Sequence, residues 1–149
     1  MPESIQHAQH YAWPVRVYYE DTDSAGVVYY ANYLRYFERA RTEWLRAQGF
    51  EQTHLTEQLG VVFVVRSIQV EYLMPARFND ELVISVELAA VGASQISMNQ
   101  CVERSTGTLT QKLVEAQVQL ACVSRAAMRP VRIPKILRAR INDQTTRTT

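Results

Sequence analysis

The stretch at residues 31–49, ANYLRYFERARTEWLRAQG, decides the fold, because it predicts one long amphipathic helix. Its apolar side chains recur at spacings of three, four and seven residues and form one stripe, which Arg41 interrupts. The members of the stripe are Tyr33, Leu34, Phe37, Ala40, Trp44 and Leu45. Gly49 is a typical residue after a helix C-terminus, and a short second helix is expected at 52–59. We therefore expect a helix over residues 31–48 with one face packed against another layer.

Much of the remaining chain alternates between apolar and polar residues with period two, which is typical of strands with one buried face. Strands are predicted at residues 15–19, 67–72, 81–88, 95–103 and 114–122. Because no helix separates the later strands, the sheet is expected to be antiparallel. The predicted fold class is α+β, with the long helix on the apolar face of a curved sheet. Long strand edges need a partner, so we expect a homodimer that joins two sheets.

Length, composition and charge predict a single domain. The chain has 149 residues, of which 47% are hydrophobic and 21% charged, as in globular proteins. The expected organisation is a loose lead-in at 1–12, one domain at 13–141 and a disordered tail at 142–149. The net charge of +1 argues against a general nucleic-acid binder. Residues 1–124 carry −5 and residues 125–149 carry +6, so the basic end is expected to bind an anionic group or surface, or to be a solvated tail.

The sequence also predicts the compartment. No signal peptide is visible, and the longest strongly apolar run, residues 61–65, is far too short to insert into a membrane. Cys101 and Cys122 are too few for a disulfide scaffold, and the strand pattern places them on opposite kinds of face. We expect two reduced thiols in a cytoplasmic protein.

The candidate site is the stretch at residues 18–33, YYEDTDSAGVVYYANY, which joins the first strand to the long helix. Glu20, Asp21 and Asp23 stand within four residues and repel one another, so their crowding needs a reason. They lie just before the helix, whose free N–H groups and dipole can stabilise a developing oxyanion. A carboxylate beside such groups can attack a carbonyl or activate water, as acyl transfer requires.

The residues alone leave other roles for this stretch open. An EF-hand calcium loop would match at Asp21, Asp23 and Gly26, but Ala25 and Asn32 lack the required oxygen ligands. A magnesium-dependent phosphotransferase also uses Asp-x-Asp after a strand, but it needs a parallel sheet with intervening helices. A polar turn that caps the helix is a further alternative. The histidines and cysteines show neither a triad context nor zinc spacing, so neither a triad nor a zinc site is expected.

Residues 19–33, YEDTDSAGVVYYANY, followed by FERARTE at 37–43, resemble the hotdog-fold acyl-CoA thioesterases. Among these, the chain is most similar to the Tol–Pal-associated, YbgC-like branch of the 4-hydroxybenzoyl-CoA thioesterase family. The similarity covers about residues 13–141. Its shorter segments are FVVR at 63–66, VEY at 70–72, PAR at 75–77, ND at 79–80, RP at 129–130 and IP at 133–134.

The resemblance implies a hotdog fold, in which a five-stranded antiparallel sheet wraps a long central helix. It implies that Asp23 is the catalytic carboxylate, as nucleophile or general base, and that the backbone N–H of Tyr30 is the oxyanion donor. Asp21 would then be structural or electrostatic. Further substrate-binding residues are expected at Gly26, Val28, Tyr29, Arg77, Arg129 and Arg132. The arginines among them can bind the phosphates of coenzyme A by charge-assisted hydrogen bonds.

The resemblance also implies an acyl-CoA substrate and a homodimer, or a dimer of dimers, with sites at the subunit interface. It implies no metal and no bound cofactor, because coenzyme A is part of the substrate. Tyr30 stands where the Tol–Pal branch commonly has His and the 4-hydroxybenzoyl branch often has Tyr, so short aliphatic, long aliphatic and aromatic acyl groups all stay open. The alternative is a non-catalytic hotdog adaptor, peripheral to the inner membrane, that binds acyl carrier protein or phospholipid-synthesis enzymes.

Overall fold

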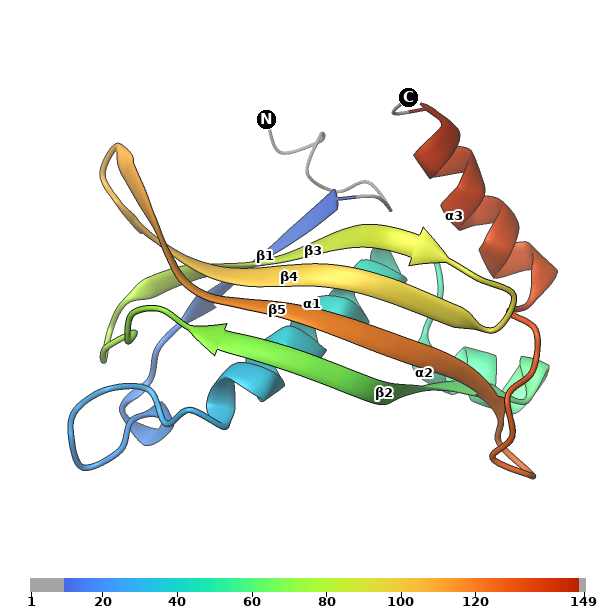
Figure 1. Cartoon of the computed structure of the whole chain (residues 1–149), viewed down its shortest axis with the longest axis horizontal. Coiled ribbons are helices and arrows are strands. Elements are labelled where there is room, and N and C mark those ends of the chain that lie inside the picture. The colour runs from blue at the N-terminus through green and yellow to red at the C-terminus, as the bar shows by residue number, and fades with distance from the viewer. Residues whose placement is uncertain (1–9, 148–149) are drawn as a thin grey trace.

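Five antiparallel strands form the single sheet of the computed structural model, which describes residues 10–147. The strands are β1 (His10–Arg16), β2 (Val61–Tyr72), β3 (Glu81–Val91), β4 (Gln95–Thr106) and β5 (Leu109–Ser124). They pair in the order β1-β3-β4-β5-β2, as Figure 1 shows, and every pair is antiparallel. The predicted α+β class with a five-stranded antiparallel sheet is confirmed.

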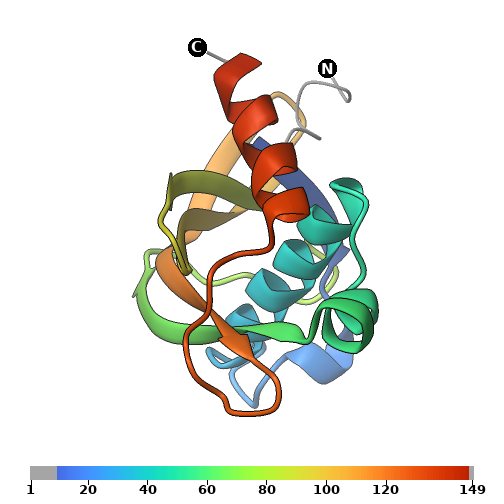
Figure 2. The ribbon, with the colours of Figure 1, turned by 90° about the vertical axis from the view of Figure 1, so that its right-hand side faces the viewer.

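One long helix lies against this sheet. The helical segments are η2 (Tyr19–Asp21), α1 (Asn32–Ala47), α2 (Gln52–His54), η3 (Leu55–Leu59) and α3 (Lys135–Arg147). Seen end-on in Figure 2, the sheet curves around α1, which agrees with the predicted helix to within one residue at each end. Gly49 follows the helix with φ +93°, a conformation that glycine adopts without strain. Among residues 10–147, none of these helices combines the length and apolar character that crossing a membrane requires.

The core lies between α1 and the inner face of the sheet, and it includes buried side chains of β5 such as Val118 and Leu120. Apart from Leu34, which is 40% exposed, the apolar stripe of α1 is buried against β1, β3 and β4. The inward side chains of β3 and β4 alternate with polar outward ones as predicted. The inner face of β2, at the edge of the sheet, is less well covered: Val65 is 45% exposed and Tyr72 is 46% exposed. Cys122 is buried and Cys101 lies on the outer face, so their prediction on opposite faces is confirmed.

The expected position of the first strand is wrong. The first strand runs from His10 to Arg16 and not over 15–19, because pairing with β3 extends it toward the N-terminus. It thus begins inside the expected lead-in, of which residues 1–9 lie outside the described part of the chain. At the other end, α3 continues to Arg147, and the expected division into a domain at 13–141 and a tail at 142–149 stays a prediction. Leu137 and Ile141, four residues apart on α3, are fully buried and hold the helix to the core.

Candidate active site

The loop that carries the acids is a small closed hairpin docked on the segment before β3. Residues 22 and 28 form an antiparallel bridge, and the Asp23 N–H donates to the Val27 carbonyl at 2.9 Å. Gly26 closes the turn with φ +81° and donates its N–H to the Asp23 carbonyl at 3.0 Å. The N–H of Val28 donates to the Ala76 carbonyl at 2.8 Å. These bonds fix the position of Asp23 relative to the start of α1.

The Asp23 side chain is exposed and only partly occupied by hydrogen bonds. One carboxylate oxygen, Oδ1, accepts the Ala25 N–H at 2.9 Å, which fixes the carboxylate orientation. The other oxygen has no hydrogen-bond partner among the described residues. This geometry leaves a charged oxygen available for a substrate or a water molecule.

The turn that leads into α1 contains an unpaired backbone donor, whereas the N–H groups of Asn32, Tyr33 and Leu34 in the first turn of the helix all have backbone acceptors. The Tyr29 N–H donates to the Asp21 carbonyl, and Tyr33 and Leu34 begin the helical bonding with the carbonyls of residues 30 and 31. Within the described chain, no acceptor takes the N–H of Tyr30, and no side chain caps the helix at Ala31. A free N–H at the positive end of a helix dipole suits a developing negative charge. The predicted oxyanion donor is therefore geometrically free to act.

Asp21 is tied into the local structure. Its carboxylate accepts the Tyr18 N–H at 2.8 Å, and its backbone carbonyl accepts both the Tyr29 N–H and the Asn32 side-chain amide. Tyr36 is a neighbour of Asp21 and is fully buried. The Tyr36 hydroxyl has no hydrogen-bond partner among the described residues. Burial raises the pKa of Tyr36, and the nearby negative charge of Asp21 raises it further. Asp21 thus connects η2, the start of α1 and a buried tyrosine.

Aromatic side chains form a wall beside the helix start. The ring of Tyr30 lies 4.9 Å from that of Tyr29 and 6.3 Å from that of Tyr72, between centroids, and Tyr33 lies 5.7 Å from Tyr72. The pKa of the exposed Tyr29 is raised by the neighbouring Tyr30 hydroxyl and, to a smaller extent, by the Asp23 charge. Tyr72 enters this wall from the end of β2, a contact that the local sequence around Asp23 could not predict. Its only sequence signal was the VEY segment at 70–72.

The other residues predicted to contact the substrate do not all lie in the same part of the molecule. Gly26 and Tyr29 are exposed at the loop, whereas Val28 is buried in the core. Arg77 is exposed and bridges the loop through its backbone pairing with Val27. Its contact with the substrate stays a prediction.

Arg129 and Arg132 lie at the other end of the molecule. They follow β5, where the Ser124 N–H donates to the Arg129 carbonyl at 2.9 Å. In Figure 1 the connection after β5 lies at the right, and the loop with Asp23 at the left. Within one chain, these two arginines are therefore not brought together with Asp23 and Arg77.

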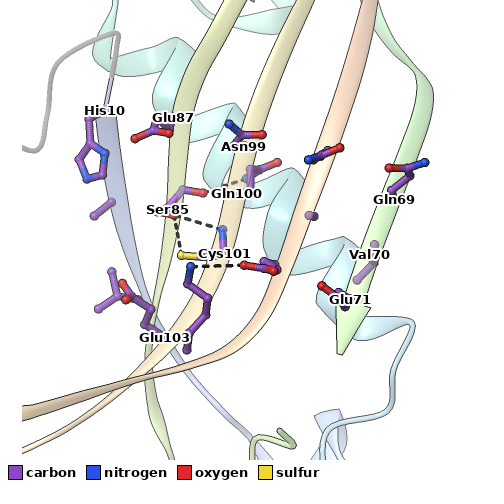
Figure 3. Close-up of a pocket in the computed structure, with 16 residues that line it drawn as sticks. His10, Gln69, Val70, Glu71, Ser85, Glu87, Asn99, Gln100, Cys101 and Glu103 are labelled. Atoms are coloured by element: carbon purple, nitrogen blue, oxygen red, sulfur yellow. Dashed lines mark hydrogen bonds and ion pairs between the residues drawn. The ribbon is translucent and has the colours of Figure 1, made fainter. Parts of the chain in front are cut away.

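A hollow lies on the outer face of the sheet, and none of the predicted site residues lines it. It has a volume of about 790 Å³ and polar walls from all five strands (Figure 3). Ser85 Oγ lies 3.1 Å from Cys101 Sγ, whose thiol pKa is raised by burial, and Lys112 forms an ion pair with Glu115 at 3.3 Å. In the described part of the chain, no group of three His, Cys, Asp or Glu side chains could hold a metal ion.

The chain resembles known proteins over most of its length. Residues 17–141 match the model of the thioesterase-like superfamily. The chain is 43% identical over 129 residues to the acyl-CoA thioesterase YbgC of Haemophilus influenzae, which covers 87% of this chain and 92% of that protein. It is 45% identical over 125 residues to the acyl-CoA thioester hydrolase YbgC of Escherichia coli O6:H1, covering 84% of this chain and 90% of that protein.

Solved structures agree in fold. A probable thioesterase from Bartonella henselae superposes with a TM-score of 0.76 at 34% identity, covering 84% of this chain and 99% of that one. The 4-hydroxybenzoyl CoA thioesterase from a Pseudomonas species superposes with a TM-score of 0.82 at 19% identity, covering 89% and 99%. At that identity, the second likeness establishes the common fold only.

Proposed function

The chain belongs to the thioesterase-like superfamily, and from this membership we propose that it hydrolyses an acyl-CoA thioester to a free acid and coenzyme A. One observation carries the proposal: an available carboxylate oxygen and an unpaired backbone N–H just before α1 lie on the same short segment, seven residues apart at Asp23 and Tyr30. Acyl transfer needs both a group that attacks or activates and a group that stabilises the oxyanion.

In the proposed mechanism, the thioester carbonyl oxygen accepts the Tyr30 N–H, which stabilises the negative charge as the carbonyl carbon becomes tetrahedral. Asp23 acts in one of two ways. As a nucleophile it forms an anhydride, which water then hydrolyses; as a general base it takes a proton from the attacking water. In both routes the carbon–sulfur bond breaks, the sulfur is protonated, and water supplies the new oxygen of the acid.

The free edge of β2 supports a dimer with composite sites. Among the described strands, β2 pairs only with β5, and its inner face carries the half-exposed Val65. A two-fold axis at this edge, perpendicular to β2, would pair the β2 strands of two copies antiparallel. β2 has 12 residues and spans about 36 Å. It runs from Val61, beside the connection after β5 that carries Arg129 and Arg132, to Tyr72, beside the site. Antiparallel pairing would therefore bring Arg129 and Arg132 of one copy toward the other copy's site.

A screen of acyl-CoA substrates tests this function. Release of free thiol is measured with a coloured thiol reagent over short aliphatic, long aliphatic and aromatic acyl groups. We expect turnover of at least one of them, and the preferred acyl group then reports the depth of the pocket. EDTA should leave the turnover unchanged, because the proposed mechanism contains no metal. Absence of thiol release from every acyl-CoA would contradict the proposal.

The basic connection after β5 favours a second candidate function. Arg125, Arg129 and Arg132 are exposed at the end of the molecule away from Asp23. Such a surface could hold an acidic partner such as acyl carrier protein, or anionic lipid at the inner membrane face. In that case the protein would be a non-catalytic adaptor, peripheral to the inner membrane. Binding of acyl carrier protein without turnover of any acyl-CoA would support this candidate over hydrolysis.

A further inference from the structure

An open groove with aromatic walls lies beside the loop that carries Asp23, and the mechanism above does not use it. Its volume is about 570 Å³. We call it the aromatic groove, and it is lined by Arg16, Val17, Tyr18, Tyr19, Glu20, Phe78 and Asn79. Its two walls come from the segment after β1 and the segment before β3.

Backbone hydrogen bonds hold the two walls together. The Val17 N–H donates to the Asp80 carbonyl at 3.0 Å, and the Asn79 N–H donates to the Val17 carbonyl at 2.9 Å. Val17 itself is fully buried and forms the floor. Asn79 adopts φ +73°, a left-handed conformation that asparagine tolerates better than most residues. The groove is therefore preformed and does not need a ligand to assemble it.

The aromatic rings of the groove are unusually open to solvent. Tyr19 is 78% exposed and Phe78 is 52% exposed, although their rings contact each other edge-to-face at 5.9 Å between centroids. Clustered exposed aromatic rings of this kind mark binding surfaces. Because the proposed dimer uses β2, at the opposite edge of the sheet from β1, a second copy would leave these rings uncovered.

Charged groups flank the rings. Arg16 donates to the Asn79 carbonyl at 3.1 Å and pairs with Glu81, and about half of its side chain stays exposed. Arg77 precedes Phe78, and its exposed guanidinium has no partner in the described part of the chain. Guanidinium groups bind phosphate, whereas the Glu20 carboxylate can accept a hydrogen bond from an exocyclic amine. Rings, phosphate-binding cations and an amine acceptor together match an adenine nucleotide.

We propose that the aromatic groove binds the adenine ring of the substrate's coenzyme A, with Arg77 and Arg16 near its phosphates. This inference rests on the proposed function, which supplies a nucleotide at the end of every substrate. The distance is suitable: Tyr19 is four residues from Asp23, so their Cα atoms lie at most about 14 Å apart. The pantetheine arm can span that interval with the thioester at Asp23.

The test compares two substrates that share one acyl group. The first is the acyl-CoA that the wild-type protein hydrolyses best, and the second is the matching N-acetylcysteamine thioester, which lacks the nucleotide. Phe78→Ala removes a stacking ring, Phe78→Tyr keeps it, and Leu109→Ala, at another exposed apolar residue that does not line the groove, is the matched control. Direct binding of adenosine 3′,5′-bisphosphate is measured by calorimetry on the same proteins.

For Phe78→Ala we expect the KM for the acyl-CoA to rise roughly five- to hundredfold, as removal of a base-stacking ring does elsewhere. The difference from wild type should vanish with the truncated thioester, and binding of the bisphosphate should weaken by a similar factor. Phe78→Tyr and Leu109→Ala should keep the wild-type KM. An unchanged KM for the acyl-CoA, or an equal rise on both substrates, would overturn the proposal. Wild-type protein that hydrolyses neither substrate would contradict the proposed function, while the calorimetry would still decide whether the groove binds the nucleotide.

Discussion

Replacing Tyr30 with proline isolates the proposed oxyanion donor. Proline lacks the backbone N–H, and no described acceptor uses that N–H in the free protein, so the substitution breaks no hydrogen bond. Proline is also well tolerated at the start of a helix. The change removes the tyrosine ring as well, so Tyr30→Ala, which keeps the N–H, is the matched control. The ring is 61% exposed and contacts Tyr29 and Tyr72, and both variants lose these contacts equally.

The expected difference between the two variants follows from the number of donors lost. Removal of one oxyanion-hole donor lowers kcat by about 10²–10³, or about 3–4 kcal/mol of transition-state stabilisation. We expect this loss in kcat for Tyr30→Pro relative to Tyr30→Ala. The assay is steady-state release of coenzyme A, with circular dichroism and thermal unfolding to establish that both variants fold. A folded Tyr30→Pro variant with the kcat of Tyr30→Ala would refute the assignment of this N–H.

Three further changes test other parts of the account. Arg77→Ala should raise the KM for acyl-CoA several-fold with little change in kcat, because it removes a phosphate contact; steady-state kinetics measure this, and an unchanged KM counts against the role. Val65→Lys should cost the single chain less than about 0.5 kcal/mol at this exposed site but dissociate the dimer, which light scattering detects; a dimer that persists contradicts the β2 interface. Ile141→Ala should lower the free energy of unfolding by about 2–4 kcal/mol, since the side chain is fully buried; chemical denaturation measures this, and unchanged stability would show that α3 contributes little to the core.

Local patterns predicted the elements whose partners lie nearby in sequence. The stripe of α1 and the glycine after it define the helix almost to the residue, because both signals act within a few turns. The alternation in β3, β4 and β5 predicts their buried faces for the same reason. Asp23 and Tyr30 also lie on one short segment, so their proximity follows from the chain itself.

Elements that depend on distant pairing could not be placed from the sequence. The start of β1 is set by the partner of His10, which is Glu87 on β3, and not by any local alternation. Tyr72 reaches the site from the end of β2. The separation of Arg129 from Asp23 depends on the direction in which β5 leaves the sheet, which a charge count cannot show. The polar residues 142–147 carry little helical pattern of their own, and the two buried apolar residues before them hold α3 in place.

Turnover by Asp23→Asn is the most direct test of the central claim that the Asp23 carboxylate carries out thioester hydrolysis. The variant keeps the size of the side chain and an oxygen that can accept the Ala25 N–H, so the loop should fold as before. Asp21→Asn is the matched control, because its amide oxygen can still accept the Tyr18 N–H. We predict that Asp23→Asn lowers kcat by at least about 10²–10⁴, as loss of an acid–base group does, while Asp21→Asn stays close to wild type. Wild-type kcat in a correctly folded Asp23→Asn protein would contradict the account.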